Sequence, residues 1–177
     1  MIKEVKIKTW QIITVIICLI LGILLHFTYE WFGKNLIVGI FSAVNESTWE
    51  HLKLAFYPML IMAVIGYFII GDMSDNYWLA QALGIITALI FIISFFYTYR
   101  GIIGINIDSL NIGSFFIAIF FGEYITYKIL ISNKNYNAEK VSVIFLIILL
   151  FSFILYTFRP PEIPLFEDPR NGSFGIM

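Results

Sequence analysis

Five long apolar stretches alternate along the chain with short connections that hold most of its polar residues. The stretches cover residues 10–32, 48–70, 77–98, 112–131 and 141–158. Each approaches the roughly 20 apolar residues that a helix needs to cross a bilayer. Trp10, Trp31, Trp49 and Trp78 are the four tryptophans, and all fall near ends of these stretches, where indole rings lie at the headgroup level. The pattern predicts an all-α integral membrane bundle of five transmembrane helices.

Composition supports this assignment and excludes several other classes. Of the 177 residues, 60% are hydrophobic and 13% are charged, against about 25% charged in a soluble domain. The net charge is −1 and the basic residues form no stripe, so nucleic acid is excluded as a partner. The only cysteine, Cys18, lies inside the first apolar stretch, which excludes an intramolecular disulfide and CxxC metal motifs.

The N-terminus resembles a signal sequence but has features of a retained anchor. Lys3, Lys6 and Lys8 precede an apolar stretch that is too long for a signal peptide and has no small-residue cleavage site. Because the first helix usually sets the topology, we expect a multi-pass protein of the cell membrane with a cytoplasmic N-terminus. The C-terminus would then be extracytoplasmic.

The chain divides into a transmembrane domain, residues 1–158, and a C-terminal tail, residues 159–177. The tail contains four prolines but also several large apolar residues, which is unusual for a disordered segment. We expect it to be ordered and to pack over the extracytoplasmic side as a lid, although a simple surface anchor is an alternative. Residues 100–113 are expected to form an apolar connection that lies in the membrane interface or dips into the bundle.

The third and fourth apolar stretches carry small residues at four-residue spacing. The third contains Ala80, Gly84 and Ala88, and the fourth contains Ser114, Ala118 and Gly122. Such stripes let helix backbones approach closely in lipid. We therefore expect the third and fourth transmembrane helices to be in contact.

With this topology, most of the functional polar residues gather at the extracytoplasmic side. His26, Glu30, Glu46, Glu50 and His51 are the candidate catalytic residues there. The candidate ligand-binding residues are Asn45, Trp49, Lys53, Arg100, Asp108, Arg159 and Asp168. The opposite side has little beyond lysines and a short acidic turn, and this asymmetry is the main functional signal in the sequence.

His26 and His51 are expected at similar depth on consecutive antiparallel helices, so their side chains could face each other. A His–Glu pair suits general acid–base chemistry, and two histidines with a carboxylate suit a divalent metal with open coordination positions. The histidines lack HExxH or HxxxH spacing, however, so structural hydrogen bonding is the favoured interpretation and no residue is assigned as a metal ligand. Ser47 and Glu50 also form an S-x-x-E capping box, which gives Glu50 a structural alternative.

Glu123 is predicted near the midpoint of the fourth transmembrane helix, where a charged residue costs about 3 kcal/mol. It must be protonated, partnered or close to water. We include it among the candidate catalytic residues because an ionisable group at this depth is a functional candidate.

Three polar segments resemble the signature blocks of a family of small prokaryotic multi-pass membrane proteins of unknown function. They are VNESTWEHLKLAFYPML at 44–60, YTYRGIIGINIDSLNI at 97–112 and RPPEIPLFEDPRNGSFGI at 159–176. The resemblance implies the fold and the membrane location but no activity. The chain does not fit the alkaline-ceramidase and adiponectin-receptor type of zinc hydrolase, which uses three zinc histidines and seven spans, because it has two histidines and five predicted spans.

The leading functional hypothesis is a polar extracytoplasmic site that binds, and as an enzyme would hydrolyse or transfer, a small or lipid-derived ligand. Membrane lipids are the expected partners. The first alternative is a non-catalytic interaction or scaffold protein that binds another protein or a second copy of itself. The second alternative is proton- or ion-coupled transport through Glu123.

Overall fold

The protein folds as a helical bundle in a computed structural model that describes residues 2–176. The helices in this range are α1 (Ile2–Trp31), α2 (Leu36–Phe41), α3 (Thr48–Ile70), the 3₁₀ helix η1 (Gly71–Met73), α4 (Tyr77–Ile103), α5 (Asp108–Leu130) and α6 (Glu139–Phe158). All of the α-helices except the short α2 are long and apolar enough to cross a membrane. The predicted all-α class and five spanning helices are confirmed.

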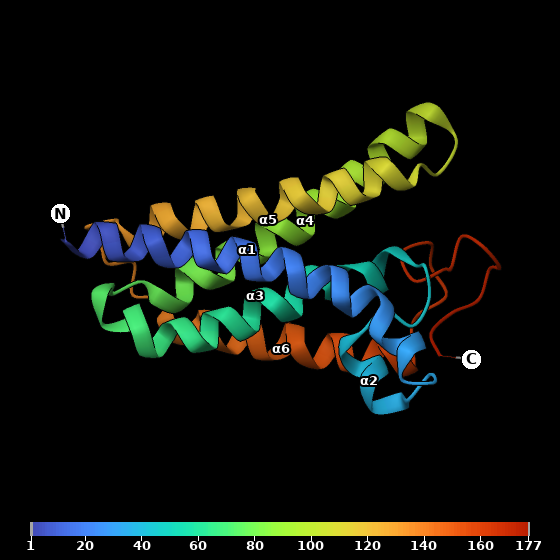
Figure 1. Cartoon of the computed structure of the whole chain (residues 1–177), viewed down its shortest axis with the longest axis horizontal. Helices are drawn as coiled ribbons and strands as arrows, with labels where there is room; N and C mark the ends of the chain where they lie inside the picture. Colours follow the sequence, from blue (N-terminus) through green and yellow to red (C-terminus); the bar gives the residue numbers. More distant parts are fainter. Residues whose placement is uncertain (1, 177) are drawn as a thin grey trace.

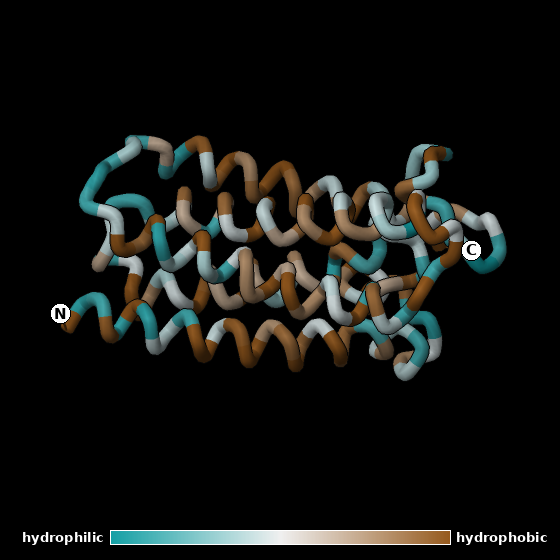
Figure 2. The backbone as a smooth tube through the Cα atoms, turned by 90° about the horizontal axis from the view of Figure 1, so that it is seen from above, coloured by the Kyte–Doolittle hydropathy of each residue, from teal (hydrophilic) through white to brown (hydrophobic). Residues whose placement is uncertain are grey.

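The long helices run side by side, with the N-terminus at one end of the bundle and the C-terminal tail at the other (Figure 1). Helix α2 and the loop before α3 lie at the same end as the tail, which we call the tail end. Hydrophobic residues dominate the middle of the bundle and hydrophilic residues concentrate towards its two ends (Figure 2). This distribution is expected for a protein whose central part lies in the hydrocarbon layer.

Several helix boundaries differ from those expected. Helix α4 continues to Ile103 and α5 begins at Asp108, so most of the expected connection 100–113 is helical. The turn is made by Gly104, whose φ of +84° is the left-handed conformation that commonly ends a helix. The unexpected α2 is preceded by the N-cap residue Asn35, whose side-chain oxygen accepts hydrogen bonds from the amides of Ile37 and Val38.

Helices α4 and α5 form a closely packed pair, which confirms the expectation from their small residues. A Cβ atom added to Gly122 would lie 2.7 Å from the carbonyl oxygen of Gly84, so the backbones are almost in contact. Thr126 donates a hydrogen bond across the same interface to the carbonyl of Ala80, at 3.3 Å. Towards the tail end this pair diverges from α1 and α3 (Figure 1).

Candidate functional site

A cavity of about 430 Å³ lies at the tail end, between α1 and α3 on one side and α4 and α5 on the other. Its volume is within the range of about 300–1,000 Å³ that is typical of small-molecule sites. We call it the tail-end pocket. Its apolar lining residues include Ile23, Phe27, Leu54, Ile92, Phe96, Ile112, Phe115 and Phe116. Its polar lining residues are His26, Glu46, Thr48, His51, Asn106, Asp108, Asn111, Ser114 and Arg170.

The pocket is open to the surface of the bundle. Ile23 and Phe27 of α1 and Ile112 of α5 line it and are also among the exposed large apolar side chains. Because α1 and α5 are both candidate membrane spans, an opening between them would face lipid. A ligand that is dissolved in the bilayer would then have a lateral route into the pocket.

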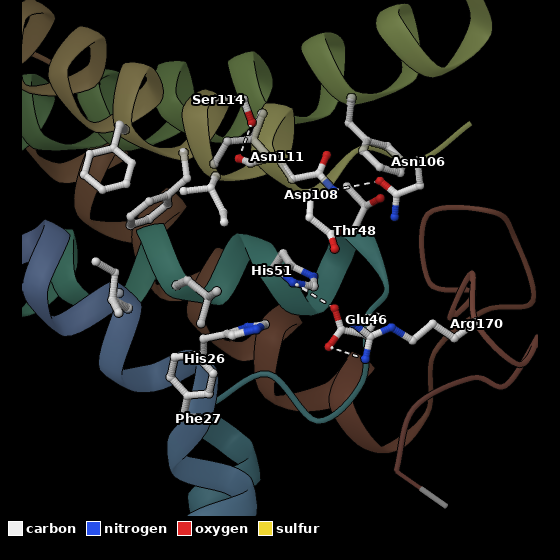
Figure 3. A pocket seen from close by; sticks show the side chains of 18 residues that line it. His26, Phe27, Glu46, Thr48, His51, Asn106, Asp108, Asn111, Ser114 and Arg170 are labelled. Carbon is white, nitrogen blue, oxygen red and sulfur yellow. Dashed lines mark hydrogen bonds and ion pairs between the residues drawn. The ribbon is translucent and has the colours of Figure 1, made fainter. Parts of the chain in front are cut away.

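His26, Glu46 and His51 form a compact group in the lining of the pocket. One potential ligand atom from each residue lies within 4.8 Å of the others, and the two imidazole centroids are 5.3 Å apart. Figure 3 shows the two rings and the carboxylate directed towards one another. The structure therefore brings His26 and His51 together with a carboxylate, which is that of Glu46.

The orientation of His51 is set by the first turn of α3. Its Nδ1 atom donates a hydrogen bond to the Ser47 carbonyl oxygen at 2.9 Å. A carbonyl oxygen can only accept, so Nδ1 carries a proton and Nε2 is the second ring nitrogen available for chemistry. That Nε2 atom lies 3.5 Å from Oε2 of Glu46.

Glu46 is held in place by the loop before α3 and by the tail. Its backbone amide donates to Asp168 Oδ2 at 3.2 Å, and its Oε1 atom lies 3.2 Å from the Arg170 guanidinium. The buried Asp168 also accepts from the Arg170 amide at 2.8 Å. The tail thus contributes Asp168 as support for the loop and Arg170 as a charged wall of the pocket.

The tail is anchored to the start of α3 by an aromatic cluster. The ring of Trp49 lies 4.6 Å from that of Phe153 and 4.8 Å from that of Phe166, measured between centroids. The Trp49 amide also donates to the Leu165 carbonyl at 3.0 Å. Asn45 adds a hydrogen bond from its side-chain amide to the Gly175 carbonyl at 3.1 Å. Trp49 and Asn45 therefore contact the tail, and neither lines the pocket.

Glu50 and Lys53 form a buried ion pair on a different face of α3. Lys53 Nζ lies 2.6 Å from Oε2 of Glu50, with the side chains 0% and 2% exposed. The serine half of the expected capping box is present, because Ser47 Oγ accepts from the Glu50 amide at 3.3 Å. The Glu50 carboxylate instead accepts from the Val44 amide at 3.1 Å. These contacts give both residues a structural role at the tail end.

None of the remaining candidate residues belongs to the histidine group. Glu30 is exposed and pairs with Lys34 at 3.5 Å. Arg100 is exposed and lies 5.7 Å from the centroid of Phe96, and Arg159 is the exposed residue that ends α6. Asp108 lines the pocket from the first turn of α5.

Glu123 lies inside the bundle, away from the tail-end pocket. Its side chain is 3% exposed, and its Oε2 atom has no hydrogen-bond partner among the described residues. Within residues 2–176, Glu123 is not part of the group of potential metal ligands.

Sequence reasoning did not name Asn106, Asn111 or Arg170 as site residues, although all three line the pocket. Tyr99 joins the two asparagines through its hydroxyl, which lies 2.9 Å from Asn106 Oδ1 and 2.5 Å from Asn111 Oδ1. This network fixes the turn between α4 and α5. For the two asparagines, the available signal was their position in an otherwise apolar segment.

Residues 1–176 match a sequence family that is described as "Family of unknown function (DUF6512)". The chain belongs to this family. No curated protein and no solved structure matches it.

In this member of the DUF6512 family, three segments far apart in the sequence contribute to a single pocket. Glu46 and His51 come from the loop before α3 and its first turn, Asn106 and Asp108 from the α4–α5 turn, and Arg170 from the tail. Figure 3 shows these side chains around the same space. The tail-end pocket is therefore the candidate functional site of this chain.

Proposed function

We propose that the protein binds a lipid-derived ligand in the tail-end pocket, on the extracytoplasmic side of the membrane. The observation that carries this proposal is a pocket lined both by large apolar side chains and by a group of polar and charged side chains. The apolar tail of a ligand would lie along Phe27, Phe96 and Phe115. Its polar group would lie against Glu46, His51 and Arg170.

The direction of the opening favours a ligand from the bilayer over one from water. Ile23 and Ile112 flank the pocket on two spanning helices and are exposed, so an acyl chain could enter without leaving an apolar environment. The titratable groups lie near the end of α1 and in the first turn of α3. This is the depth at which a lipid headgroup meets water.

Hydrolysis or group transfer at a site without a metal ion would use His51 as the base. Its Nδ1 proton is donated to Ser47, so Nε2 of the neutral ring is the basic atom, and it lies on the pocket side next to Glu46. A base oriented in this way by a second hydrogen bond is a common arrangement in acid–base catalysis. Arg170 would pair with an anionic headgroup.

The proposal is tested with a photoactivatable lipid probe incorporated into membranes that contain the protein. We expect cross-links on α1 and α5 residues of the pocket. Ile112→Trp adds volume inside the pocket and should remove most of the cross-linking. Ile117→Trp is a matched control, since Ile117 is similarly exposed on the same helix but does not line the pocket.

Lipid identified by mass spectrometry after purification gives an independent readout. Wild type and Ile117→Trp should retain a bound lipid that Ile112→Trp loses. Equal cross-linking and equal lipid content in all three proteins would refute the proposal. The absence of bound lipid from all three would favour the non-catalytic interaction protein.

A further inference from the structure

We propose that His26, Glu46 and His51 bind a divalent transition metal ion, with zinc the best match to the ligand set. Two imidazoles and a carboxylate are among the ligand sets that catalytic zinc sites use. The three residues come from α1, the loop before α3 and α3 itself. The proposed ion goes beyond the lipid-binding proposal, because it is bound by protein atoms alone.

Two lone pairs approach each other between His51 Nε2 and Glu46 Oε2. With Nδ1 donating to Ser47, neutral His51 has an unprotonated Nε2 directed at a carboxylate oxygen 3.5 Å away. Two acceptors at this distance repel each other unless a cation lies between them. Either a proton on Nε2 or a metal ion between the two atoms would remove this repulsion.

His26 favours the metal ion over the proton. Its Nδ1 atom is buried and has no hydrogen-bond partner among the described residues, and its ring lies 5.3 Å from that of His51. Protonation of His51 would satisfy Glu46 but would leave the His26 atom without a partner. A shared metal ion would explain why the second imidazole faces the same point.

The distances require only small side-chain movements. Metal–ligand bonds of about 2.0–2.1 Å place neighbouring ligand atoms about 3.3 Å apart in a tetrahedral site. The His51–Glu46 pair is already at 3.5 Å, and the widest separation in the group is 4.8 Å or less. Rotations about the terminal torsions of His and Glu, which have broad minima, can close this difference.

The surrounding hydrogen bonds also match those of metal sites. Histidine ligands usually donate their second ring N–H to a backbone carbonyl or a carboxylate, as His51 does to Ser47. Ligating carboxylates are themselves held by outer-shell partners, and the Arg170 guanidinium lies 3.2 Å from the Glu46 carboxylate. Three protein ligands leave a fourth position, which would face the pocket and accept an oxygen atom of a ligand headgroup.

The experiment measures metal binding by full-length purified protein without added lipid. The protein is stripped with a chelator and titrated with Zn²⁺ in competition with a chromophoric chelator, and Co²⁺ is then used to report the ligand set by visible absorption. We expect about one ion per chain in the wild type. His26→Ala, His51→Ala and Glu46→Gln should each weaken binding by at least about tenfold, because even outer-shell changes cost 10–100-fold.

Glu30→Gln is the matched control for Glu46→Gln, since Glu30 is at the same end of the bundle but pairs with Lys34 on the surface. It should bind Zn²⁺ as the wild type does. Zn²⁺ should also raise the melting temperature of the stripped wild type, a readout that needs no variant. Absence of this stabilisation and of stoichiometric binding would overturn the proposal, as would binding that survives His51→Ala and Glu46→Gln.

The result is separable from the lipid-binding test. Ile112→Trp contributes no ligand atom, so it should lose lipid cross-linking and retain Zn²⁺ binding. A wild type that binds lipid but no Zn²⁺ would refute the metal site alone. A wild type that binds Zn²⁺ but no lipid would refute the lipid proposal alone.

Discussion

Replacing Lys53 with methionine tests whether the buried ion pair stabilises the tail end. Lys53 Nζ donates to Glu50 Oε2 at 2.6 Å, to the Gly39 carbonyl at 2.9 Å and to the Ser42 carbonyl at 3.4 Å. These contacts join α3 to α2 and to the loop that follows it. Methionine retains much of the apolar volume but leaves a buried carboxylate with only the Val44 amide as a donor.

The expected loss of stability follows from the burial of both partners. Removing one member of a buried ion pair costs about 3–5 kcal/mol. At about 2–4 °C per kcal/mol for a chain of 150–250 residues, Lys53→Met should lower the melting temperature by at least about 6 °C. Thermal unfolding in one detergent, followed by circular dichroism, measures this change.

Two further variants make the test specific. Lys34→Met removes an exposed ion pair whose side chains are 66% and 67% exposed. Such a pair contributes about 1 kcal/mol or less. Adding Glu50→Met to Lys53→Met should restore part of the lost stability, because the uncompensated charge is then gone. A Lys53→Met protein that melts within about 2 °C of wild type, or no lower than Lys34→Met, would refute the reasoning.

Two other substitutions probe the helix packing and the tail. Gly84→Ala should destabilise the protein by about 1–3 kcal/mol through overpacking, because its Cβ would lie 2.8 Å from the Gly122 carbonyl oxygen. Gly113→Ala has open space around its Cβ and should be neutral or stabilising by up to about 1 kcal/mol. Melting curves that rank the two variants the other way would contradict the packing. Phe166→Ala should weaken the docking of the tail by about 3–5 kcal/mol and speed proteolysis within the tail. Ile163→Ala, at an exposed position of the same tail, should leave the cleavage rate unchanged. Equal cleavage rates for the two variants would show that Phe166 is not the anchor.

The sequence predicted the bundle well because the bilayer imposes a strong pattern. Apolar stretches of about 20 residues are long enough to span, and all five become helices of the structure. Contact between α4 and α5 was predictable for a similar reason, since small residues at four-residue spacing allow the close approach seen at Gly84 and Gly122. The end of α4 was not, because isoleucines and glycines around Gly104 occur in both helices and turns.

The histidine pair was partly predictable, and its carboxylate partner was not singled out. Consecutive antiparallel helices place His26 and His51 at similar depth, as the sequence indicated. Glu30, four residues after His26, lies on the same face of the helix by its spacing, but its side chain is exposed and pairs with Lys34. The position of Glu46 depends on a loop that Asp168 supports from the tail, a contact across 122 residues that no local pattern specifies.

Residues 45–53, NESTWEHLK, are rich in polar side chains because neighbouring residues at the start of α3 point in different directions and make different contacts. Glu50 and Lys53 are three residues apart and point to the α2 side, where they are buried together. Trp49 points to the tail and packs on Phe166, and His51 points to the pocket with Glu46. Adjacent residues should therefore give different phenotypes: changes at Glu50 should lower the stability and disturb the loop before α3, and changes at His51 should act on ligand or metal binding directly.

This division also explains why a buried ion pair is placed so close to the candidate site. The loop that carries Glu46 has few apolar side chains of its own with which to pack, so its shape depends on hydrogen bonds. Glu50 accepts from Val44 at one end of the loop, and Asp168 accepts from Glu46 further along. Removing either carboxylate would free the loop, and Glu46 would lose its position opposite His51 even though neither Glu50 nor Asp168 lines the pocket.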